Sequence, residues 1–269
     1  MCTLLVLILA AAFTPAAQAA EPMTDVDVFV NDEFVELPIP ALLINSTTYV
    51  PLRAFSMAMG AESVSWNPDT DTASVHAPNL TIEIFLNGQY IIANDRYLYT
   101  EYGCPLINSS LMVPVRVISA AFDAAVEWHG VDPAVYVTSG TGSIVTGNVF
   151  YDETDLHWLS RIIDAEARGE SLAGKIAVGN VVLNRVESPL FPDNVYDVIF
   201  DDRFGIQFSP AYSGSVYCNP CTDSVLAAKF AFEGVNTAGD SLYFASVSGS
   251  WASANRPYVT TIGNHYFYA

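Results

Sequence analysis

The chain has 269 residues, of which 51% are hydrophobic and 14% charged, and its formal net charge is −19. This length predicts two domains of ordinary size or one large one, and the apolar share is large enough to build real cores. So many acidic groups would be repelled by nucleic acid phosphates and by anionic membrane surfaces, and no basic run offsets them. We therefore expect no nucleic acid partner.

The first residues of the chain have the pattern of a secretory signal. The apolar stretch from Leu4 to Phe13 is too short to span a bilayer as a helix, and Ala17 and Ala19 flank Gln18 in an A-x-A cleavage site. The usual Lys or Arg before the apolar stretch is absent. A buried N-terminal strand or helix is the alternative, but we expect residues 1–20 to be a signal peptide, with no membrane span after its removal.

Residues 25–138 are predicted to form a β-rich domain. Short runs such as Val26–Val30 and Val135–Val137 favour strands and are separated by turn-forming Asn, Asp, Pro and Gly. The clearest hairpin signal is Asn87-Gly88, which stands between IEIFL and QYIIA.

The β-rich region also contains an internal repeat. Val50–Arg53 reads VPLR and is followed by helix-forming residues and a segment that carries Trp66. Val113–Arg116 reads VPVR and is followed in the same way by Trp128. Proline near the first helical turn suits the φ angle required there, so each copy predicts a short helix and then a strand.

This repeated pattern of VPLR, a small helix, Gly-Ala, V-x-W and a closing strand resembles the copper amine oxidase N-terminal-like domain, or stalk domain, of secreted bacterial proteins. Despite that name we expect no metal site, because His76 and His129 are isolated in the sequence. Arg53 and Arg116 are expected to bind internal carboxylates or carbonyls. The resemblance implies wall attachment or spacing, so we expect the stalk domain to contact cell-wall components; a passive module is the alternative.

A linker and a second, mainly helical domain are predicted to follow. Residues 139–150 read SGTGSIVTGNVF and are rich in Gly, Ser and Thr, which is typical of a linker. The second domain, residues 151–269, is predicted to contain helices over 155–168, 172–186 and 223–233 and strands over 241–246 and 265–268. The predicted fold class is therefore α+β, with a β-rich domain followed by a helical domain that has a small sheet.

Glu166 has an unusual place in the first of these helices. At helical spacing it falls on the same stripe as Leu159, Ile162 and Ile163, near the C-terminal end of the helix. Apolar neighbours and the negative end of the helix dipole both disfavour a carboxylate, so its pKa should rise. A carboxyl group that is protonated near neutral pH can act as a general acid. The alternative is a buried Glu that an Arg or a backbone amide satisfies. Glu170 is read instead as a capping residue or an ion-pair partner of Arg168.

The second domain resembles the SleB-type cell wall hydrolases over its whole length. The segments AEARGE, VLNR, QFSP and TIGNHYFY occur in the order typical of that family. The resemblance implies a lysozyme-like, lytic-transglycosylase-like fold that cleaves peptidoglycan strands between N-acetylmuramic acid and N-acetylglucosamine. It implies that Glu166 is catalytic, and that the substrate is bound by Gln207, Phe208, Ser209, Tyr243, His265 and Tyr268.

The resemblance also implies where the protein acts and what it binds. We expect a secreted enzyme of the cell wall or spore envelope, with peptidoglycan as its partner and no cofactor or metal. We expect four other acidic residues to be helix caps or solvated surface groups: Asp197, Asp201, Asp202 and Asp240. Glu166 is then the one carboxylate that the sequence favours as a catalytic group. A single acid favours a lytic transglycosylase over hydrolysis by paired carboxylates.

Two other functions remain possible from the sequence. One is a peptidoglycan-binding protein without catalysis, in which Trp251, Tyr258 and Tyr266 would stack on sugars. The other is a zinc-dependent N-acetylmuramoyl-L-alanine amidase, although the sequence has no H-E-x-x-H motif. Cys104, Cys218 and Cys221 would remain after signal removal; a Cys218–Cys221 disulfide loop or free thiols are favoured over a zinc or redox site.

Overall fold

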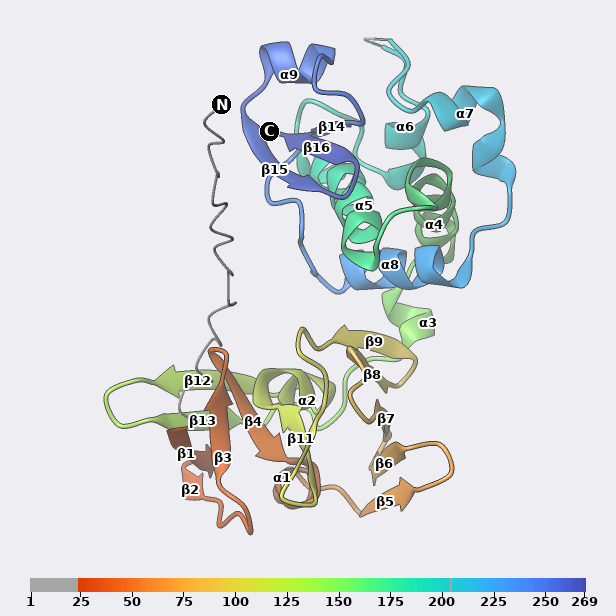
Figure 1. Cartoon of the computed structure of the whole chain (residues 1–269). Helices are drawn as coiled ribbons and strands as arrows, with labels where there is room; N and C mark the ends of the chain where they lie inside the picture. The colour runs from red at the N-terminus through yellow and green to blue at the C-terminus, as the bar shows by residue number, and fades with distance from the viewer. Residues whose placement is uncertain (1–23, 204) are drawn as a thin grey trace, which may run out of the picture.

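The computed structural model describes residues 24–203 and 205–269, so the predicted signal peptide lies outside the described residues. Two domains lie one above the other and are joined through the short helix α3 (Gly147–Phe150) (Figure 1). The N-terminal domain is β-rich and the C-terminal domain is mainly helical with a small sheet, which confirms the predicted α+β fold class. No helix of the described residues is long and apolar enough to cross a membrane.

Two sheets form the N-terminal domain. One has the strand order β10-β11-β4-β3-β1-β13-β12, with β2 beside β1, and the other has the order β5-β6-β7-β8-β9. In the larger sheet the strands are β1 (Thr24–Val30), β2 (Glu33–Phe34), β3 (Ala41–Ile44), β4 (Thr47–Pro51), β10 (Leu106–Ile107), β11 (Ser110–Pro114), β12 (Ala125–His129) and β13 (Ala134–Thr138). The smaller sheet consists of β5 (Ser63–Asn67), β6 (Thr72–Ala77), β7 (Leu80–Phe85), β8 (Tyr90–Ala93) and β9 (Arg96–Tyr99). The predicted turn at Asn87-Gly88 joins β7 to β8, as expected.

The internal repeat forms the same local structure twice. In each copy a proline, Pro51 or Pro114, is the N-cap of a seven-residue helix, α1 (Leu52–Ala58) or α2 (Val115–Ala121). The strand after each helix carries the tryptophan of its copy. Both helices bury apolar side chains in the core of the domain, so the predicted helix-then-strand unit is confirmed.

Three helices form the centre of the C-terminal domain. They are α4 (Glu153–Ala167), α5 (Leu172–Glu187) and α8 (Thr222–Phe232), which pack against one another around one apolar core. The peripheral elements are α6 (Val195–Ile199), α7 (Ser209–Ser213), a 3₁₀ turn (Ser215–Tyr217) and α9 (Trp251–Asn255). A sheet of order β14-β16-β15, formed by β14 (Tyr243–Ala245), β15 (Tyr258–Ile262) and β16 (His265–Tyr268), closes one side. Strand β15 was not predicted.

Helix α5 is buried on almost every side, as its nearly continuous apolar sequence predicts. Its polar side chains are used inside the fold. The Asn180 amide donates to the carbonyl of Val235 at 2.8 Å and accepts from the amide of Thr237 at 2.9 Å. The side-chain amide of Asn184 donates to the carbonyls of Gly239 and Ser241. These bonds hold the chain between α8 and β14 in place.

The segment predicted as a linker lies against the N-terminal domain. The side-chain amide of Asn94 donates to the carbonyl of Ile144 at 3.2 Å, and the amide of Gly147 donates to the Asn94 carbonyl at 2.7 Å. The last residues of the segment form α3. Its Gly, Ser and Thr residues therefore make ordered turns here instead of a freely hinged connection.

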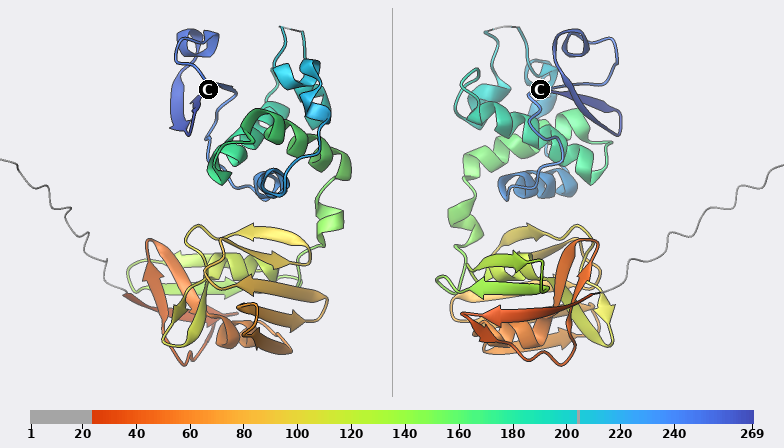
Figure 2. Two further views of the ribbon diagram at one scale, coloured as in Figure 1. Left: turned by 45° about the vertical axis from the view of Figure 1, so that its right-hand side comes forward. Right: turned by 90° about the vertical axis from the view of Figure 1, so that its left-hand side faces the viewer.

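The two domains meet where β9 faces α8, below α4 and α5 (Figure 2). The Arg96 guanidinium forms a two-pronged ion pair with Glu233, with N–O distances of 3.0 and 2.6 Å. Tyr151 donates its hydroxyl to Glu233 at 2.6 Å, and Phe230 packs against the rings of Tyr90 and Tyr99. This contact combines a buried ion pair with aromatic packing.

Helix α8 begins at Thr222, one residue before its predicted start, with Cys221 as its N-cap and Asp223 in its first turn. Gly234, with a φ angle of 86°, lies just beyond the end of the helix. Cys104, Cys218 and Cys221 are all free thiols, so of the two favoured alternatives the structure has the free thiols and not the Cys218–Cys221 disulfide.

Candidate active site

Glu166 lies one residue before the C-terminal end of α4. The helix begins at Asp152, whose carboxylate accepts hydrogen bonds from the amides of Thr154 and Asp155. The core-facing residues of the same helix, Leu159 and Ile163, are fully buried. Glu166 is half-buried and lines a groove of about 900 Å³. Among the described residues no ion pair or hydrogen bond holds its carboxyl group.

Burial raises the pKa of Glu166 to about 7. The physical cause is the loss of water around the carboxylate, which disfavours its charged form. About half of the Glu166 carboxyl groups are therefore protonated at pH 7, and such a group can donate a proton to a molecule in the groove. This is the behaviour expected from its place on the apolar stripe of α4.

The groove is formed by segments that are distant in sequence. Its lining residues come from α4, from α5 and the segment after it, from the segment before α7 and its first residue, and from β14, α9 and β16. Glu166 is the only carboxylate among the described residues that line it. Aromatic and cationic side chains also line it: Phe191, Tyr243, Phe244, Trp251, Arg185 and Arg256.

The structure brings four of the six predicted substrate-binding residues to this groove: Gln207, Ser209, Tyr243 and His265. Gln207 donates to the carbonyl of Gly205 at 2.9 Å, which fixes the loop before α7. Burial lowers the pKa of His265, so its imidazole is neutral near pH 7, and its Nδ1 has no hydrogen-bond partner among the described residues.

Phe208 and Tyr268 do not line the groove, which departs from the prediction. Phe208 is 1% exposed and belongs to the apolar core, where its ring packs near that of Phe244. Tyr268 is 4% exposed and pairs with Tyr243 across the sheet. Both residues support side chains that line the groove, and neither offers a surface to a substrate.

Arg185 is a residue of the groove whose place the sequence did not predict. It is 3% exposed, its Nε donates to the carbonyl of Leu242 at 2.7 Å, and Nη1 has no partner among the described residues. Its guanidinium lies 4.8 Å from the ring centre of Phe191 and 5.4 Å from that of Tyr243. Burial lowers the pKa of Arg185 to about 10, which still leaves it charged.

Glu170 has a structural task that differs from its predicted pairing with Arg168. Its carboxylate accepts from the backbone amide of Asn264 at 3.1 Å and from the side-chain amide of the same residue at 2.8 Å. Arg168 pairs instead with Asp164 at 2.9 Å. Glu170 therefore ties the end of α4 to the β15–β16 turn, which positions His265 at the groove.

Replacing Gly263 by alanine should loosen this turn. Its φ angle is 56°, and a Cβ atom would lie 1.9 Å from Oε2 of Glu170. We expect Gly263→Ala to lower the free energy of unfolding by roughly 1–3 kcal/mol, because the backbone is strained and the carboxylate must move. Denaturant unfolding measures this. Gly249→Ala is the control, since a Cβ there meets no atom within 4 Å; equal losses in both variants would contradict the assignment.

Glu166 should also make stability depend on pH. Its pKa is about 7 in the folded chain and near 4.5 in the unfolded chain, so ionisation costs folding free energy as pH rises from 4.5 through 7. Glu166→Gln cannot ionise. We expect it to be more stable than the wild type above pH 7, by roughly 1–3 kcal/mol, and no more stable below pH 4.5. Thermal unfolding at pH 4 and pH 8 checks this, and a gain of the same size at both values would argue against a raised pKa.

Comparison with known families finds a match in each of the two regions of the chain. Residues 169–268 match the Cell Wall Hydrolase family, and residues 29–137 match the Copper amine oxidase N-terminal domain family. Both resemblances drawn from the sequence are thereby confirmed. Glu166 lies three residues before the start of the first match, so that match does not itself include it.

Curated relatives match the C-terminal half of the chain. A spore cortex-lytic enzyme of Halalkalibacterium halodurans is 33% identical over 120 residues, which are 44% of this chain and 35% of that protein. A spore cortex-lytic enzyme of Oceanobacillus iheyensis is 33% identical over 133 residues, 48% of this chain and 46% of that protein. The chain thus spans less than half the length of these relatives.

A solved structure gives a similar result. The catalytic domain of the germination-specific lytic transglycosylase SleB from Bacillus anthracis is 31% identical, with a TM-score of 0.41, and the match covers 46% of this chain and all of that chain. The structural match covers one of the two domains described above.

Proposed function

From the premise that the chain contains a cell wall hydrolase domain, we propose that it cleaves the glycan strand of peptidoglycan as a lytic transglycosylase, with Glu166 as general acid and base. The observation that carries this proposal is the half-buried carboxyl group of Glu166, with a pKa of about 7 and no partner among the described residues, in a groove of about 900 Å³. The relatives named as spore cortex-lytic enzymes and as a lytic transglycosylase support it.

The proposed reaction needs one carboxyl group acting twice. Protonated Glu166 donates its proton to the glycosidic oxygen between N-acetylmuramic acid and N-acetylglucosamine as the bond to the anomeric carbon breaks. The carboxylate then accepts the proton of the muramoyl C6 hydroxyl, whose oxygen bonds to the anomeric carbon. The products are a 1,6-anhydromuramoyl end and a free 4-hydroxyl on the departing sugar. Atoms balance without water, and Glu166 regains its proton.

A two-carboxylate hydrolysis has less support from the groove. Such enzymes place a second Asp or Glu across the bond from the acid. Of the acidic residues weighed from the sequence, Asp201 is buried in an ion pair with Arg203 at 2.8 Å, and Asp197 is bonded to Asn194. None of Asp197, Asp201, Asp202 and Asp240 lines the groove.

The remaining groove residues suit a sugar strand. Tyr243 and Trp251 offer aromatic faces, and their ring centres lie 5.8 Å apart. Arg185 and Arg256 add positive charge to an otherwise acidic protein, which suits the carboxylates of muramic acid or its stem peptide. We place these residues, with Gln207, Ser209 and His265, in substrate binding. Phe208 and Tyr268 act as supports beneath them.

Export and action in the cell wall or spore envelope belong to the same proposal. The support is the signal-like sequence of residues 1–20 and the nature of the substrate. A zinc-dependent amidase needs side chains that bind the zinc ion. Among the described residues there is no cluster of three or more His, Cys, Asp or Glu that could hold a metal ion.

Mass spectrometry of soluble products from digested peptidoglycan tests the function. Anhydro-muramoyl ends are expected. Reducing muramoyl ends would show that water is the acceptor, released stem peptides would show an amidase, and binding without any soluble product would leave only a wall-binding protein.

A further inference from the structure

The two copies of the repeat in the N-terminal domain are related by a pseudo-twofold axis. Strands β4 and β11 pair antiparallel, and Val50 lies opposite Val113, its equivalent in the repeat. The pairs on either side also correspond: Pro51 with Met112, and Pro114 with Tyr49. An axis through the Val50–Val113 pair therefore exchanges one copy with the other, as in an isologous dimer but within one chain.

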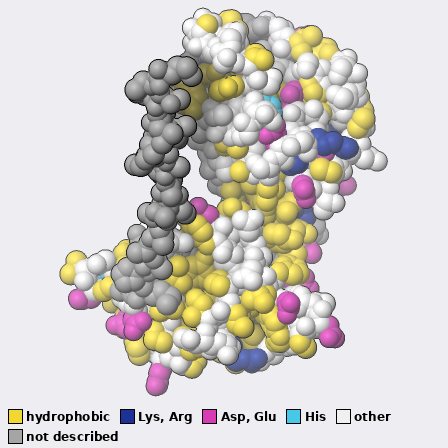
Figure 3. Space-filling model, viewed as in Figure 1, with side chains coloured by type: hydrophobic (Ala, Val, Ile, Leu, Met, Phe, Trp, Pro, Cys, Tyr) yellow, Lys and Arg dark blue, Asp and Glu magenta, His cyan; other side chains and the backbone are white. Residues whose placement is uncertain are grey.

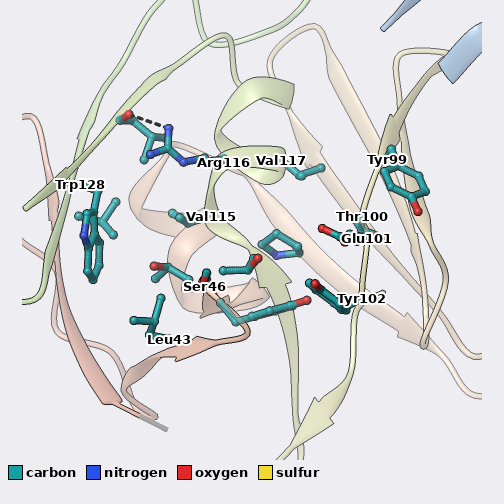
Figure 4. Close-up of a pocket in the computed structure, with 16 residues that line it drawn as sticks. Leu43, Ser46, Tyr99, Thr100, Glu101, Tyr102, Val115, Arg116, Val117 and Trp128 are labelled. Carbon is teal, nitrogen blue, oxygen red and sulfur yellow. Dashed lines mark hydrogen bonds between the residues drawn. The ribbon is translucent and has the colours of Figure 1, made fainter. Parts of the chain in front are cut away.

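This symmetry produces two pockets of similar size. The Trp128 pocket, of about 540 Å³, is lined by Arg116 and Trp128 of the second copy and by Ser46 of the first (Figure 4). The Trp66 pocket, of about 490 Å³, is lined by Arg53 and Trp66 of the first copy and by Ser109–Leu111 of the second. Each pocket thus takes its Arg and Trp from one copy and a hydroxyl-bearing turn from the other.

Both tryptophans present indole surface to these pockets. Trp66 is 42% exposed and Trp128 is 37% exposed, and neither stacks on another aromatic ring among the described residues. Strands β5 and β12, which carry them, have the same pattern of buried and exposed positions. The face of an indole is electron-rich and attracts the weakly positive C–H groups on one face of a sugar ring. A large exposed indole in a pocket therefore suits a saccharide.

The two arginines of the N-terminal domain that form no ion pair among the described residues lie in these two pockets. Between residues 24 and 138 the only Lys or Arg residues are Arg53, Arg96 and Arg116. Arg96 is occupied by its ion pair with Glu233. The other two lie one in each pocket. Arg116 uses one N–H group on the carbonyl of Val126 at 3.3 Å, and no ion pair involving Arg53 or Arg116 is found among the described residues.

We infer that the N-terminal domain binds acidic glycan strands at two equivalent pockets, one around Trp66 and Arg53 and one around Trp128 and Arg116. In each, a sugar ring lies on the indole and the guanidinium pairs with a carboxylate of the glycan. The choice of peptidoglycan strands, whose muramic acid carries a lactyl carboxylate, rests on the proposed function. Two sites on one domain would hold the enzyme on its polymeric substrate between cleavage events.

The two pockets differ in one charged residue. Glu101 lines the Trp128 pocket, on the side away from Trp128 and near Tyr99 and Tyr102 (Figure 4). No carboxylate lines the Trp66 pocket among the described residues. Because Glu101 repels an acidic ligand, the Trp66 pocket is the tighter of the two for a strand that carries carboxylates.

Titration calorimetry of the full chain tests the inference. The parent protein is Glu166→Gln, so that the strand is not consumed, and the probe is soluble glycan strands of alternating N-acetylglucosamine and N-acetylmuramic acid without stem peptides. Trp66→Ala and Trp128→Ala should each remove one binding site or weaken it at least tenfold, and the double variant should retain only binding at the catalytic groove. Phe34→Ala is the control: Phe34 is 59% exposed in the same domain and lines neither pocket.

The arginine variants test the charge requirement. Arg53→Gln and Arg116→Gln should abolish the preference for the muramic acid strand over an uncharged chitin oligosaccharide of equal length. Unchanged stoichiometry and affinity in a folded double tryptophan variant would overturn the inference. If the parent protein bound both glycans equally well, the inferred preference for a glycan that carries carboxylates would be overturned. Cleavage by the wild-type chain is measured separately, so a failure of catalysis is distinguished from a failure of these pockets.

Discussion

The Glu166→Gln variant is expected to keep its fold and to lose release of anhydro-muropeptides by a factor on the order of 10³ or more. The amide has nearly the same shape as the carboxyl group, but its N–H protons are too weakly acidic to transfer to the glycosidic oxygen and it is too weak a base to accept the proton of the C6 hydroxyl, so both steps of the proposed reaction fail. Mass spectrometry of digested peptidoglycan, together with circular dichroism of the variant, checks this.

The matched control for this variant is Glu153→Gln. Glu153 lies in the first turn of the same helix α4, its side chain is exposed, and it is absent from the groove. It should digest peptidoglycan at the wild-type rate. If Glu166→Gln released anhydro-muropeptides at the wild-type rate, Glu166 would not be the catalytic acid.

The same proton sets the expected pH dependence of activity. A general acid must be protonated in the free enzyme, so kcat/KM should fall as pH rises past about 7, the pKa of Glu166. Because the pKa is raised by burial, this alkaline limb should lie well above the range of an ordinary glutamate. A rate that stayed constant between pH 6 and pH 9 would contradict the raised pKa.

The position of Glu166 could be predicted because helical periodicity alone decides which side chains lie on the same side of α4 as Glu166. Leu159, Ile163 and Glu166 fall on one stripe whatever packs against it. The burial of α5 follows from its own sequence in a different way, because that sequence is apolar on almost every side. Which side chains share a face of one helix can be predicted from sequence, because this depends only on the number of residues per helical turn.

Arg185 and the pair Phe208 and Tyr268 could not be placed in this way. An Arg near the end of a helix is usually read as a solvated charge, and only the approach of Phe191 and Tyr243 from other segments buries this one. Phe208 directly precedes α7, and whether its ring faces the groove or the core depends on how α7 docks. Such burial depends on tertiary packing, which periodicity does not include.

The two composite pockets of the N-terminal domain also could not be predicted from sequence, because they depend on how strands pair. The sequence gives two copies of a helix-strand unit, but the exchange of turns between the copies follows from the register of β4 on β11. A different register would place the hydroxyl-bearing turns away from Trp66 and Trp128. The repeat could therefore be predicted, while the two composite pockets could not.

Removing Arg96 is expected to be among the most destabilising changes in the chain. Its partner Glu233 has a side chain that is 4% exposed, so Arg96→Met leaves a buried carboxylate without its counter-ion. Breaking a buried ion pair from one side costs about 3–5 kcal/mol. Tyr151 still donates to Glu233 at 2.6 Å, which offsets part of the loss. Thermal unfolding should show a lower Tm for the C-terminal domain and two separate transitions, because the contact between β9 and α8 is lost.

The double variant Arg96→Met/Glu233→Met separates the cost of an unpaired charge from the value of the pair. With both charges gone, apolar side chains fill the contact beside Phe150 and the aromatic rings of β9, and most of the stability should return. Arg53→Met is the control, since Arg53 is exposed, lies in the same domain and has no ion pair among the described residues. If Arg96→Met were no more harmful than Arg53→Met, the ion pair would contribute nothing measurable to the contact between the two domains.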